Sequence, residues 1–371
     1  MHKYRIKQIQ PVFSSKDFLF LKQAYNSNFL TENDFTKKFE AKISNIVGSK
    51  YSCATSNWTL GLYSCIKALN IGEGDEVIVP NLTFIATSNA VILSGAKPVL
   101  CEVNINTLCI DEEKIVKLIN KKTKAIILVH LYGNCCDINK IKKISNKKNI
   151  KIIEDAAQAL GVRYNKKFVG TLGDVGGYSF YANKIITSGE GGIAVTNNLN
   201  IKRKIYQIKN HGRDKKGIYI HKNIGYNFST TEMQSSIGLS QLFSLKKNIK
   251  KKKYIYEFYQ KKLKNIPQIK FIKANKFTDM IPWFTNICAP KALKLSKFLN
   301  KNGIEIRRIF YPLNLQPCYL KNKNLVKNLN GNFNISKYVY NNFLSLPSSS
   351  NIKDQELKFV CDKIIKFYKS D

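Results

Sequence analysis

The sequence predicts an α/β fold with two domains: a large α/β domain built on a mixed, mostly parallel sheet, and a smaller C-terminal α+β domain. Between about residues 50 and 200, short apolar runs rich in β-branched residues alternate with segments of helical spacing. The 371 residues exceed what one hydrophobic core usually covers, and the 44% that are hydrophobic suffice for a second core. The predicted domains are residues 1–245 and 246–371.

The expected elements follow in chain order. Apolar runs predict strands over 76–80 (EVIVP), 97–103 (KPVLCEV), 124–132 (KAIILVHLY), 150–155 (IKIIED), 176–180 (GGYSF) and 191–196 (GGIAVT). Helical spacing predicts helices over 59–69 and from residue 83 onward, and the end of another helix at 115–120. It also predicts a helical stretch through 201–264 and a last helix from 354, with mixed strands and helices after residue 267. Because ligands of such sheets bind beyond the carboxyl ends of strands, Asp155 and Ser179 are the first functional candidates.

The chain is strongly basic, with 61 Lys and Arg against 25 Asp and Glu and a formal net charge of +36. Such a charge attracts nucleic acid, anionic lipid or phosphorylated substrates. Lysine is spread over the whole chain rather than gathered in an arm, so no specific nucleic-acid binding is predicted. The densest run, residues 246–253 (KKNIKKKK), is interpreted as the solvated face of a helix rather than as a phosphate-binding stripe.

Cysteine and histidine usage favours a metal-free protein in a reducing compartment. The nine cysteines include no Cys-x-x-Cys pair, and the four histidines, His2, His130, His211 and His221, lie far apart in sequence. The N-terminus lacks the apolar core of a signal peptide, and no run reaches the roughly 18 apolar residues of a membrane span. We therefore expect a cytoplasmic protein that does not enter the membrane.

The segment 177–192 (GYSFYANKIITSGEGG) holds the residue with the most distinctive chemistry, Lys184. A lone lysine is usually solvated, but this one lies in a short stretch between two predicted strands whose only other charged residue is Glu190. An amine in such a place has a lowered pKa, so it can form a Schiff base with an aldehyde cofactor and then move a proton. Pyridoxal phosphate also needs a carboxylate at its ring nitrogen, donors for its phosphate and a flat partner for its ring.

Asp155 closes the run KIIED and is a candidate for that carboxylate. It would keep the pyridine nitrogen protonated and so preserve the electron sink of the cofactor. The structural alternative is a helix N-cap before the run AAQAL. The spacing alone leaves both open.

With these residues in hand, the chain resembles the DegT/DnrJ/EryC1/StrS sugar aminotransferases, a family of fold-type I pyridoxal-phosphate enzymes, over nearly its whole length. Five motifs that occur in the family's order carry the resemblance. They are GEGDEVIVPNLTFIATSNAV (72–91), HLYGN (130–134), IEDAAQALG (153–161), YSFYANKIITSGEGG (178–192) and GYNFSTTEMQSSIGLSQL (225–242). The resemblance implies a pyridoxal 5'-phosphate cofactor and an aminotransferase that acts on a nucleotide-linked keto sugar.

By matching motif, the resemblance implies that Lys184 forms the Schiff base and acts as acid and base, with Asp155 at the ring nitrogen. It also places Gln158 beside the cofactor's phenolic oxygen and stacks Phe84 on the ring, although an aromatic side chain after a strand is otherwise a typical core residue. Ser179 would bind the phosphate.

Backbone amides at the helix start near Trp58 and Thr59 would also bind the phosphate, where the helix dipole favours an anion. The family usually has Asn-Gly-Thr there, whereas this chain has Asn57-Trp58-Thr59. An indole therefore replaces the glycine that lets the backbone approach a phosphate.

The same resemblance implies a homodimer with its active site at the interface. Asn227 matches the residue that reaches the neighbouring subunit's phosphate, and its structural alternative is a turn residue. The family often continues with Arg-Met where this chain has Ser229-Thr230. His211, Tyr311 and Asn314 are the candidates for sugar contacts.

Within the family, the runs NKIITSGEGG, HLYGN, FYPLNLQP and LPSSS most resemble the GDP-perosamine synthases. This implies transfer of an amino group from glutamate to C4 of GDP-4-keto-6-deoxymannose, with the product used in surface polysaccharide (O-antigen) synthesis. A UDP- or dTDP-linked keto sugar is the alternative. A related 3-dehydratase is disfavoured because those enzymes carry His in place of Lys184, and a polyanion-binding protein without turnover is disfavoured by the intact Lys184, Asp155, Gln158 and Ser179.

Overall fold

The computed structural model describes residues 4–215 and 217–369, and its centre is a seven-stranded mixed sheet. The strands follow the order β1-β9-β8-β5-β4-β2-β3, in which β3, β2, β4, β5 and β8 run parallel and β9 is antiparallel to both β8 and β1. Their bounds are β1 Tyr51–Thr55, β2 Glu76–Pro80, β3 Lys97–Cys101, β4 Thr123–Val129, β5 Lys151–Asp155, β8 Val175–Ser179 and β9 Gly192–Thr196. The mixed, mostly parallel sheet confirms the predicted fold class.

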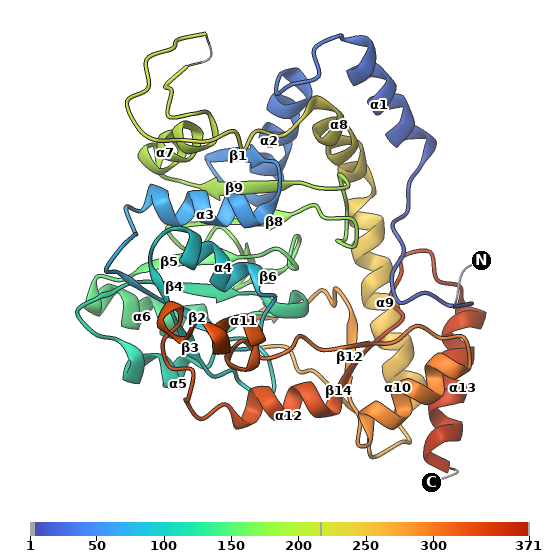
Figure 1. The fold of residues 1–371 in the computed structure, drawn as a ribbon. Helices are drawn as coiled ribbons and strands as arrows, with labels where there is room; N and C mark the ends of the chain where they lie inside the picture. Colours follow the sequence, from blue (N-terminus) through green and yellow to red (C-terminus); the bar gives the residue numbers. More distant parts are fainter. Residues whose placement is uncertain (1–3, 216, 370–371) are drawn as a thin grey trace.

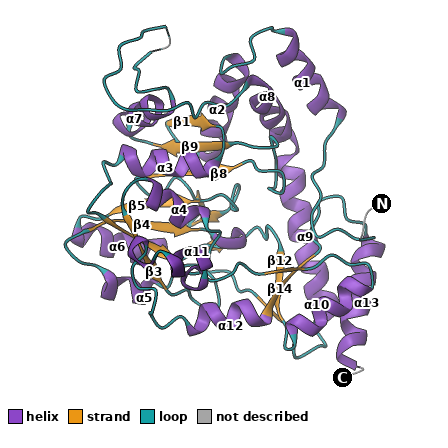
Figure 2. Ribbon diagram, viewed as in Figure 1, coloured by secondary structure: helices purple, strands orange, loops and turns teal. Residues whose placement is uncertain are grey.

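The strands of the sheet are buried on both faces because helices pack against it, as a parallel sheet requires. Figures 1 and 2 show the sheet as one layer with α3 and α4 lying across it, and α1, α2 and α8 grouped beyond β1. The helices of this part are α1 Ser15–Asn26, α2 Asp34–Val47, α3 Trp58–Ala68, α4 Ala86–Leu93, α5 Glu112–Ile115, α6 Ile138–Lys148, α7 Leu199–Lys209 and α8 Glu232–Gln241.

A second, antiparallel sheet has the order β10-β12-β14-β13 and forms the small C-terminal part with three helices. The strands are β10 Lys270–Phe271, β12 Thr285–Cys288, β13 Arg307–Arg308 and β14 Phe343–Leu346, and the helices are α9 Leu245–Leu263, α10 Ala292–Lys301 and α13 Asp354–Lys369. In Figure 1 the long helix α9 runs from the end of α8 down to this part. A separate apolar core, to which Ile6 near the N-terminus contributes, fills the space between these elements.

The remaining elements connect the two parts. A three-stranded sheet β11-β6-β7 joins Thr278–Asp279 (β11) to the pair Arg163–Tyr164 (β6) and Lys167–Phe168 (β7). The helices α11 Pro317–Lys321 and α12 Asn334–Asn342 lie between β13 and β14, and a bridge from Lys327 to Val99 places this segment against β3. Within the described residues the 3₁₀ turns are η1 Val116–Leu118, η2 Leu131–Gly133, η3 Leu242–Ser244, η4 Leu313–Leu315 and η5 Lys323–Leu325.

Four local expectations need correction. The helix expected from residue 83 begins at Ala86, the helix at 115–120 continues past Ile115 only as a 3₁₀ turn, and β1 was not predicted. The helical stretch 201–264 is interrupted, since α7 ends at Lys209 and the described residues of 210–231 form turns and extended chain. His211, with φ 57°, and Gly212, with φ 79°, explain the break because left-handed residues end a helix.

The lysine run 246–253 lies on α9, and Lys246, Lys247 and Lys250 are exposed as expected. Lys252 is a correction to the solvated-face interpretation. It is 1% exposed, and its ammonium donates hydrogen bonds to the carbonyl oxygens of Trp283 and Ser348. The helix therefore turns one lysine of the run into the interior.

The predicted domain boundary at residue 245 stays a prediction. The ends of the chain, residues 1–3 (which include His2) and 370–371, lie outside the described part. Over residues 4–215 and 217–369, no helix combines the length and apolar character that a bilayer span requires. The same residues hold no group of three or more His, Cys, Asp or Glu side chains arranged for a metal ion.

Candidate active site

A cavity of about 800 Å³ opens at the carboxyl ends of the central strands, where an α/β sheet places its ligands. Thr83 and Phe84 follow β2, Tyr132 follows β4, Asp155 ends β5 and Ser179 ends β8. The small C-terminal part closes the other side. The residues it contributes to the lining are Trp283, Phe284, Arg307, Arg308, Phe310 and Ser345.

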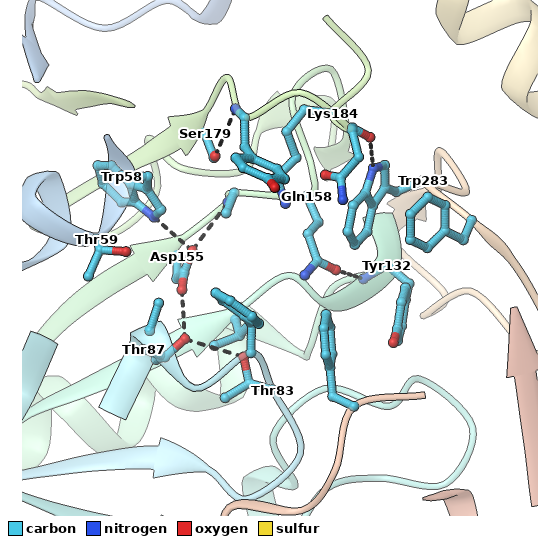
Figure 3. A pocket seen from close by; sticks show the side chains of 18 of the residues that line it. Trp58, Thr59, Thr83, Thr87, Tyr132, Asp155, Gln158, Ser179, Lys184 and Trp283 are labelled. Atoms are coloured by element: carbon cyan, nitrogen blue, oxygen red, sulfur yellow. Dashed lines mark hydrogen bonds between the residues drawn. The ribbon is translucent and has the colours of Figure 1, made fainter. Parts of the chain in front are cut away.

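Seven of the residues predicted from sequence line this one cavity: Trp58, Thr59, Phe84, Asp155, Gln158, Ser179 and Lys184. They are separated by up to 126 positions in the sequence, and Figure 3 shows Thr59, Asp155, Gln158, Ser179 and Lys184 around a common space. The topology brings them together because they end or follow four strands, β1, β2, β5 and β8, at the same edge of the sheet.

Asp155 is held from three directions. The indole Nε1 of Trp58 donates to Oδ1 at 2.8 Å, the hydroxyl of Thr87 donates to Oδ2 at 2.8 Å, and the amide of Ala157 donates to Oδ1 at 3.2 Å. The residues after Asp155 form turns rather than a helix, so the N-cap interpretation is wrong. A carboxylate 6% exposed and fixed at the cavity wall is the group that a pyridine nitrogen requires.

Lys184 follows β8 in a turn and reaches the same cavity (Figure 3). Burial lowers the pKa of its amine from 10.5 to about 8, while the negative charge of Asp155 opposes that shift. Its nitrogen lies 4.0 Å from the ring centre of Trp283, whose own Nε1 donates to the carbonyl oxygen of Asn183 at 2.7 Å. At pH 7 about a tenth of this amine is therefore unprotonated and nucleophilic, far more than for a lysine of ordinary pKa.

Gln158 is oriented by the backbone. Its side-chain oxygen accepts the amide N–H of Tyr132 at 2.8 Å, so its NH₂ group remains as a donor at the cavity. Tyr132 adopts φ 54°, and its ring stacks on Phe310 at 5.4 Å and on Trp283 at 6.0 Å. A stacked aromatic wall and one fixed amide donor suit a flat, oxygen-bearing ring.

The start of α3 and the end of β8 form a polar end of the cavity. Asn57 caps α3 by accepting the amide of Leu60 at 3.0 Å, which leaves the first amides of the helix, those of Trp58 and Thr59, without partners within the helix. The hydroxyls of Thr59 and Ser179 lie at the same end. Helix amides and hydroxyls together are suitable donors for a phosphate.

Phe84 is 55% exposed and lies 5.8 Å from Phe310 in a tilted arrangement at the cavity. The core interpretation of this side chain is therefore wrong, because a core aromatic is covered on all sides. Its ring is available to a ligand.

Four predicted residues lie outside the lining of this cavity within the described chain: Asn227, His211, Tyr311 and Asn314. Asn227 is exposed and accepts the amide of Ser229, and His211 is an exposed loop residue. The side-chain oxygen of Asn314 accepts from Asn81 at 2.9 Å and so joins the η4 segment to the end of β2. Their proposed contacts with a neighbouring subunit or a sugar stay predictions.

Tyr311 lies nearer the cavity than the other three. Its ring packs edge-on against Tyr340 at 4.8 Å, and Tyr340 in turn lies under the guanidinium of Arg308 at 3.6 Å. Arg308 lines the cavity, so Tyr311 is one aromatic layer behind the wall.

Sequence reasoning missed several lining residues, among them Thr87, Tyr132, Trp283, Arg307 and Arg308. Thr87 and Tyr132 fall inside the motifs TFIATSN and HLYGN, whose presence was a usable signal. Trp283 and the two arginines come from the C-terminal part, and only the packing of that part over the sheet brings them to the cavity.

These groups match the needs of pyridoxal phosphate one by one. Lys184 supplies the amine, Asp155 the carboxylate for the ring nitrogen, Gln158 a donor for the phenolic oxygen, and the start of α3 with Ser179 the phosphate donors. The residues present therefore fit this cofactor.

Comparisons with known proteins agree with this geometry. The model of the DegT/DnrJ/EryC1/StrS aminotransferase family matches residues 13–365. The chain is 33% identical over 365 residues to a GDP-perosamine synthase of Vibrio cholerae, with 97% of this chain and 98% of that protein covered. It is 35% identical over 333 residues to a dTDP-3-amino-3,6-dideoxy-alpha-D-galactopyranose transaminase of Aneurinibacillus thermoaerophilus, with 89% of each covered.

Among solved structures, Helicobacter pylori PseC, an aminotransferase involved in the biosynthesis of pseudoaminic acid, superposes with a TM-score of 0.91. Its sequence is 26% identical, and the match covers 99% of this chain and 100% of that one.

Proposed function

The chain belongs to the DegT/DnrJ/EryC1/StrS aminotransferase family and is a pyridoxal-phosphate-dependent nucleotide-sugar aminotransferase; from this premise we propose that it makes GDP-perosamine. In the proposed reaction, glutamate gives its amino group to the C4 ketone of GDP-4-keto-6-deoxymannose. The observation that carries the choice of sugar is the match to GDP-perosamine synthases of Vibrio cholerae and of Escherichia coli O157:H7, each 33% identical over at least 97% of both chains.

The dTDP-sugar transaminase with 35% identity favours a second candidate, an amino transfer to a dTDP-linked keto sugar. Its match covers less of the chain, 89% against 97%. Loops around the site select the nucleotide and the carbon that is aminated. The more extensive match to the GDP-perosamine synthases therefore supports the GDP sugar over the dTDP sugar.

When bound, pyridoxal phosphate supplies a carrier for the amino group and a ring that takes up the electrons of a broken C–H bond. We assign Lys184 the work of accepting and returning the proton, because burial lowers its pKa to about 8 and the neutral amine is available near neutral pH. Asp155 is fixed at the end of β5, where two side chains and a backbone amide hold both of its oxygens.

The cavity's apolar wall keeps water away from the amine. Tyr132, Trp283 and Phe310 form a continuous stacked surface beside Lys184. At the rim, Arg307 and Arg308 are the cations that meet an entering anion, such as a diphosphate or a carboxylate. Low local polarity strengthens each of these charge interactions relative to water.

We further propose that two subunits complete each site, with Asn227 reaching the cofactor phosphate held by the neighbouring subunit. Asn227 is exposed and lies in the segment that forms a bridge to Asn210, so its side chain is accessible to a second copy. A homodimer, a cytoplasmic location and a use of the product in surface polysaccharide remain predictions.

The test is a product assay with competing sugars. The purified protein with pyridoxal phosphate and one donor at a time (glutamate, glutamine or aspartate) is offered GDP-4-keto-6-deoxymannose, dTDP-3-keto-6-deoxygalactose, dTDP-4-keto-6-deoxyglucose or the corresponding UDP sugar. Products are identified by mass and by co-elution with standards. GDP-perosamine formed at least about tenfold faster than the other products supports the proposal. Preferential amination of a dTDP or UDP sugar overturns the sugar assignment, and amination with glutamine or aspartate but not glutamate overturns the donor.

A further inference from the structure

Trp58 occupies a slot that three separate glycines keep open. Its ring is 5% exposed at the start of α3, between Gly61 of the same helix and Gly177 of β8. A Cβ added at Gly177 would lie 2.3 Å from two carbons of the indole, and one added at Gly61 would lie 2.6 Å from another. Gly192 of β9 passes so close to the backbone of Trp58 that a Cβ there would lie 2.6 Å from its nitrogen.

The slot aims the indole N–H at Asp155 rather than at the cavity. The Nε1–Oδ1 distance of 2.8 Å and the burial of both side chains give a hydrogen bond to an ionised group in surroundings of low polarity (Figure 3). Such bonds contribute more than those between neutral partners, and their geometry is fixed when both partners are packed.

Counting acceptor positions on Asp155 separates its two oxygens. A carboxylate has about four lone-pair sites, two on each oxygen. Oδ1 accepts two hydrogen bonds, from Trp58 and from the amide of Ala157, and is saturated. Oδ2 accepts one, from Thr87, whose hydroxyl lies 3.3 Å from that of Thr83. One site on Oδ2 therefore stays open.

From these contacts we propose that Trp58 is a positioning residue that locks Oδ1 of Asp155, so that Oδ2 is the oxygen presented to the protonated ring nitrogen of the cofactor. This rests on the role of Asp155 in the proposed function. In the sequence, Trp58 replaces a glycine that lets the backbone approach the phosphate. In the structure, its indole instead acts at the opposite end of the site, on the carboxylate of Asp155. Its contribution is made through Asp155 and not by contact with the substrate.

The first measurement uses the cofactor-free protein, whose only two tryptophans are Trp58 and Trp283. Indole ¹⁵N labelling gives one N–H resonance for each, assigned with Trp58→Phe and Trp283→Phe. Asp155→Asn should shift the Trp58 resonance and leave the Trp283 resonance in place, because Trp283 donates to Asn183. A Trp58 resonance that ignores Asp155→Asn overturns the proposal.

The second measurement is a double-mutant cycle on the dissociation constant of pyridoxal phosphate. Trp58→Phe keeps an aromatic ring in the slot and removes the N–H, and it should weaken cofactor binding at least about tenfold, the scale of one hydrogen bond to a charged group. Because Trp58 acts through Asp155, Trp58→Phe should cause little further loss in an Asp155→Asn background.

The cycle also separates the two proposals. Losses that simply add show that Trp58 only fills space, which overturns the positioning role and leaves the role of Asp155 standing. Unchanged cofactor affinity in Asp155→Asn alone removes the premise, because it shows that this carboxylate does not meet the cofactor.

Discussion

Replacing Lys252 by methionine should remove a pH-dependent cost that the fold carries. The ammonium of Lys252 is 1% exposed and donates to the carbonyls of Trp283 at 2.9 Å and of Ser348 at 2.5 Å. Burial lowers the pKa of this amine from 10.5 to about 7. Methionine has a similar length and no charge, so the variant isolates the ionisation of this one group.

The direction of this pH effect on folding stability follows from the number of protons that the folded and the unfolded chain bind. Between pH 10.5 and pH 7 the unfolded chain takes up a proton on Lys252 that the folded chain does not, so the stability falls as the pH falls, and below pH 7 it levels off. At 1.36 kcal/mol for each pH unit, the wild type should lose about 2 kcal/mol relative to Lys252→Met between pH 9 and pH 7. The variant also leaves two carbonyls without their donor, at a cost of about 1–3 kcal/mol each, but that cost does not depend on pH.

Urea unfolding of both proteins, stripped of cofactor, at pH 7, 8 and 9 measures this difference. The other titrating lysines are common to both chains and cancel in the comparison. Parallel stability profiles over this range would show that Lys252 keeps its proton when folded and would refute the reasoning.

Three further substitutions and one pH profile test the site. In a thermal unfolding assay, Gly177→Ala should destabilise the fold by more than about 3 kcal/mol. The added Cβ would lie 2.1 Å from the carbonyl oxygen of Ile193 and 2.3 Å from the ring of Trp58. The control Gly189→Ala, which has open space around it but φ 82°, should cost only about 1 kcal/mol. Equal losses for the two variants would contradict the tight slot. Lys184→Arg should abolish turnover and the visible band of covalently held cofactor, because a guanidinium does not deprotonate. In the wild type, the rate at which the protein captures the cofactor should rise from pH 6.5 to about 8 as the amine of Lys184 loses its proton. A capture rate that is flat with pH would contradict the lowered pKa.

The large sheet was predictable because its strands are short apolar runs bounded by turns. The run EVIVP coincides with β2, and the expected final helix begins at Asp354 as α13 does. β1 was missed because YSCAT is short and mixes polar with small residues, and its place is fixed by pairing with β9 rather than by its own pattern. The break after Lys209 depends on left-handed backbone at His211 and Gly212, which helical periodicity does not reveal.

Some residues of the candidate site were likewise predictable from the sequence, and others were not. Asp155 and Ser179 end strands, so the rule for ligands at strand ends found them, whereas Phe84 was named only through the family resemblance. Trp283, Arg307 and Arg308 lie more than a hundred residues further along the chain from Asp155 and reach the cavity only through the packing of the C-terminal sheet. Lys252 was placed on a solvated face because seven of the eight positions of its run, residues 246–253, are Lys or Asn, and only the phase of α9 turns it inward.

Trp58 shows why one position could not be judged alone. Considered by itself, an indole in place of glycine predicts a backbone that no longer approaches a phosphate. The structure turns the ring away from the start of α3 into the space left by Gly61 and Gly177, so the first amides of the helix still line the cavity. The same turn gives Asp155 a donor that glycine lacks. The consequence of that residue is therefore set by glycines 3 and 119 positions away and by a carboxylate 97 positions away, none of which a local motif includes.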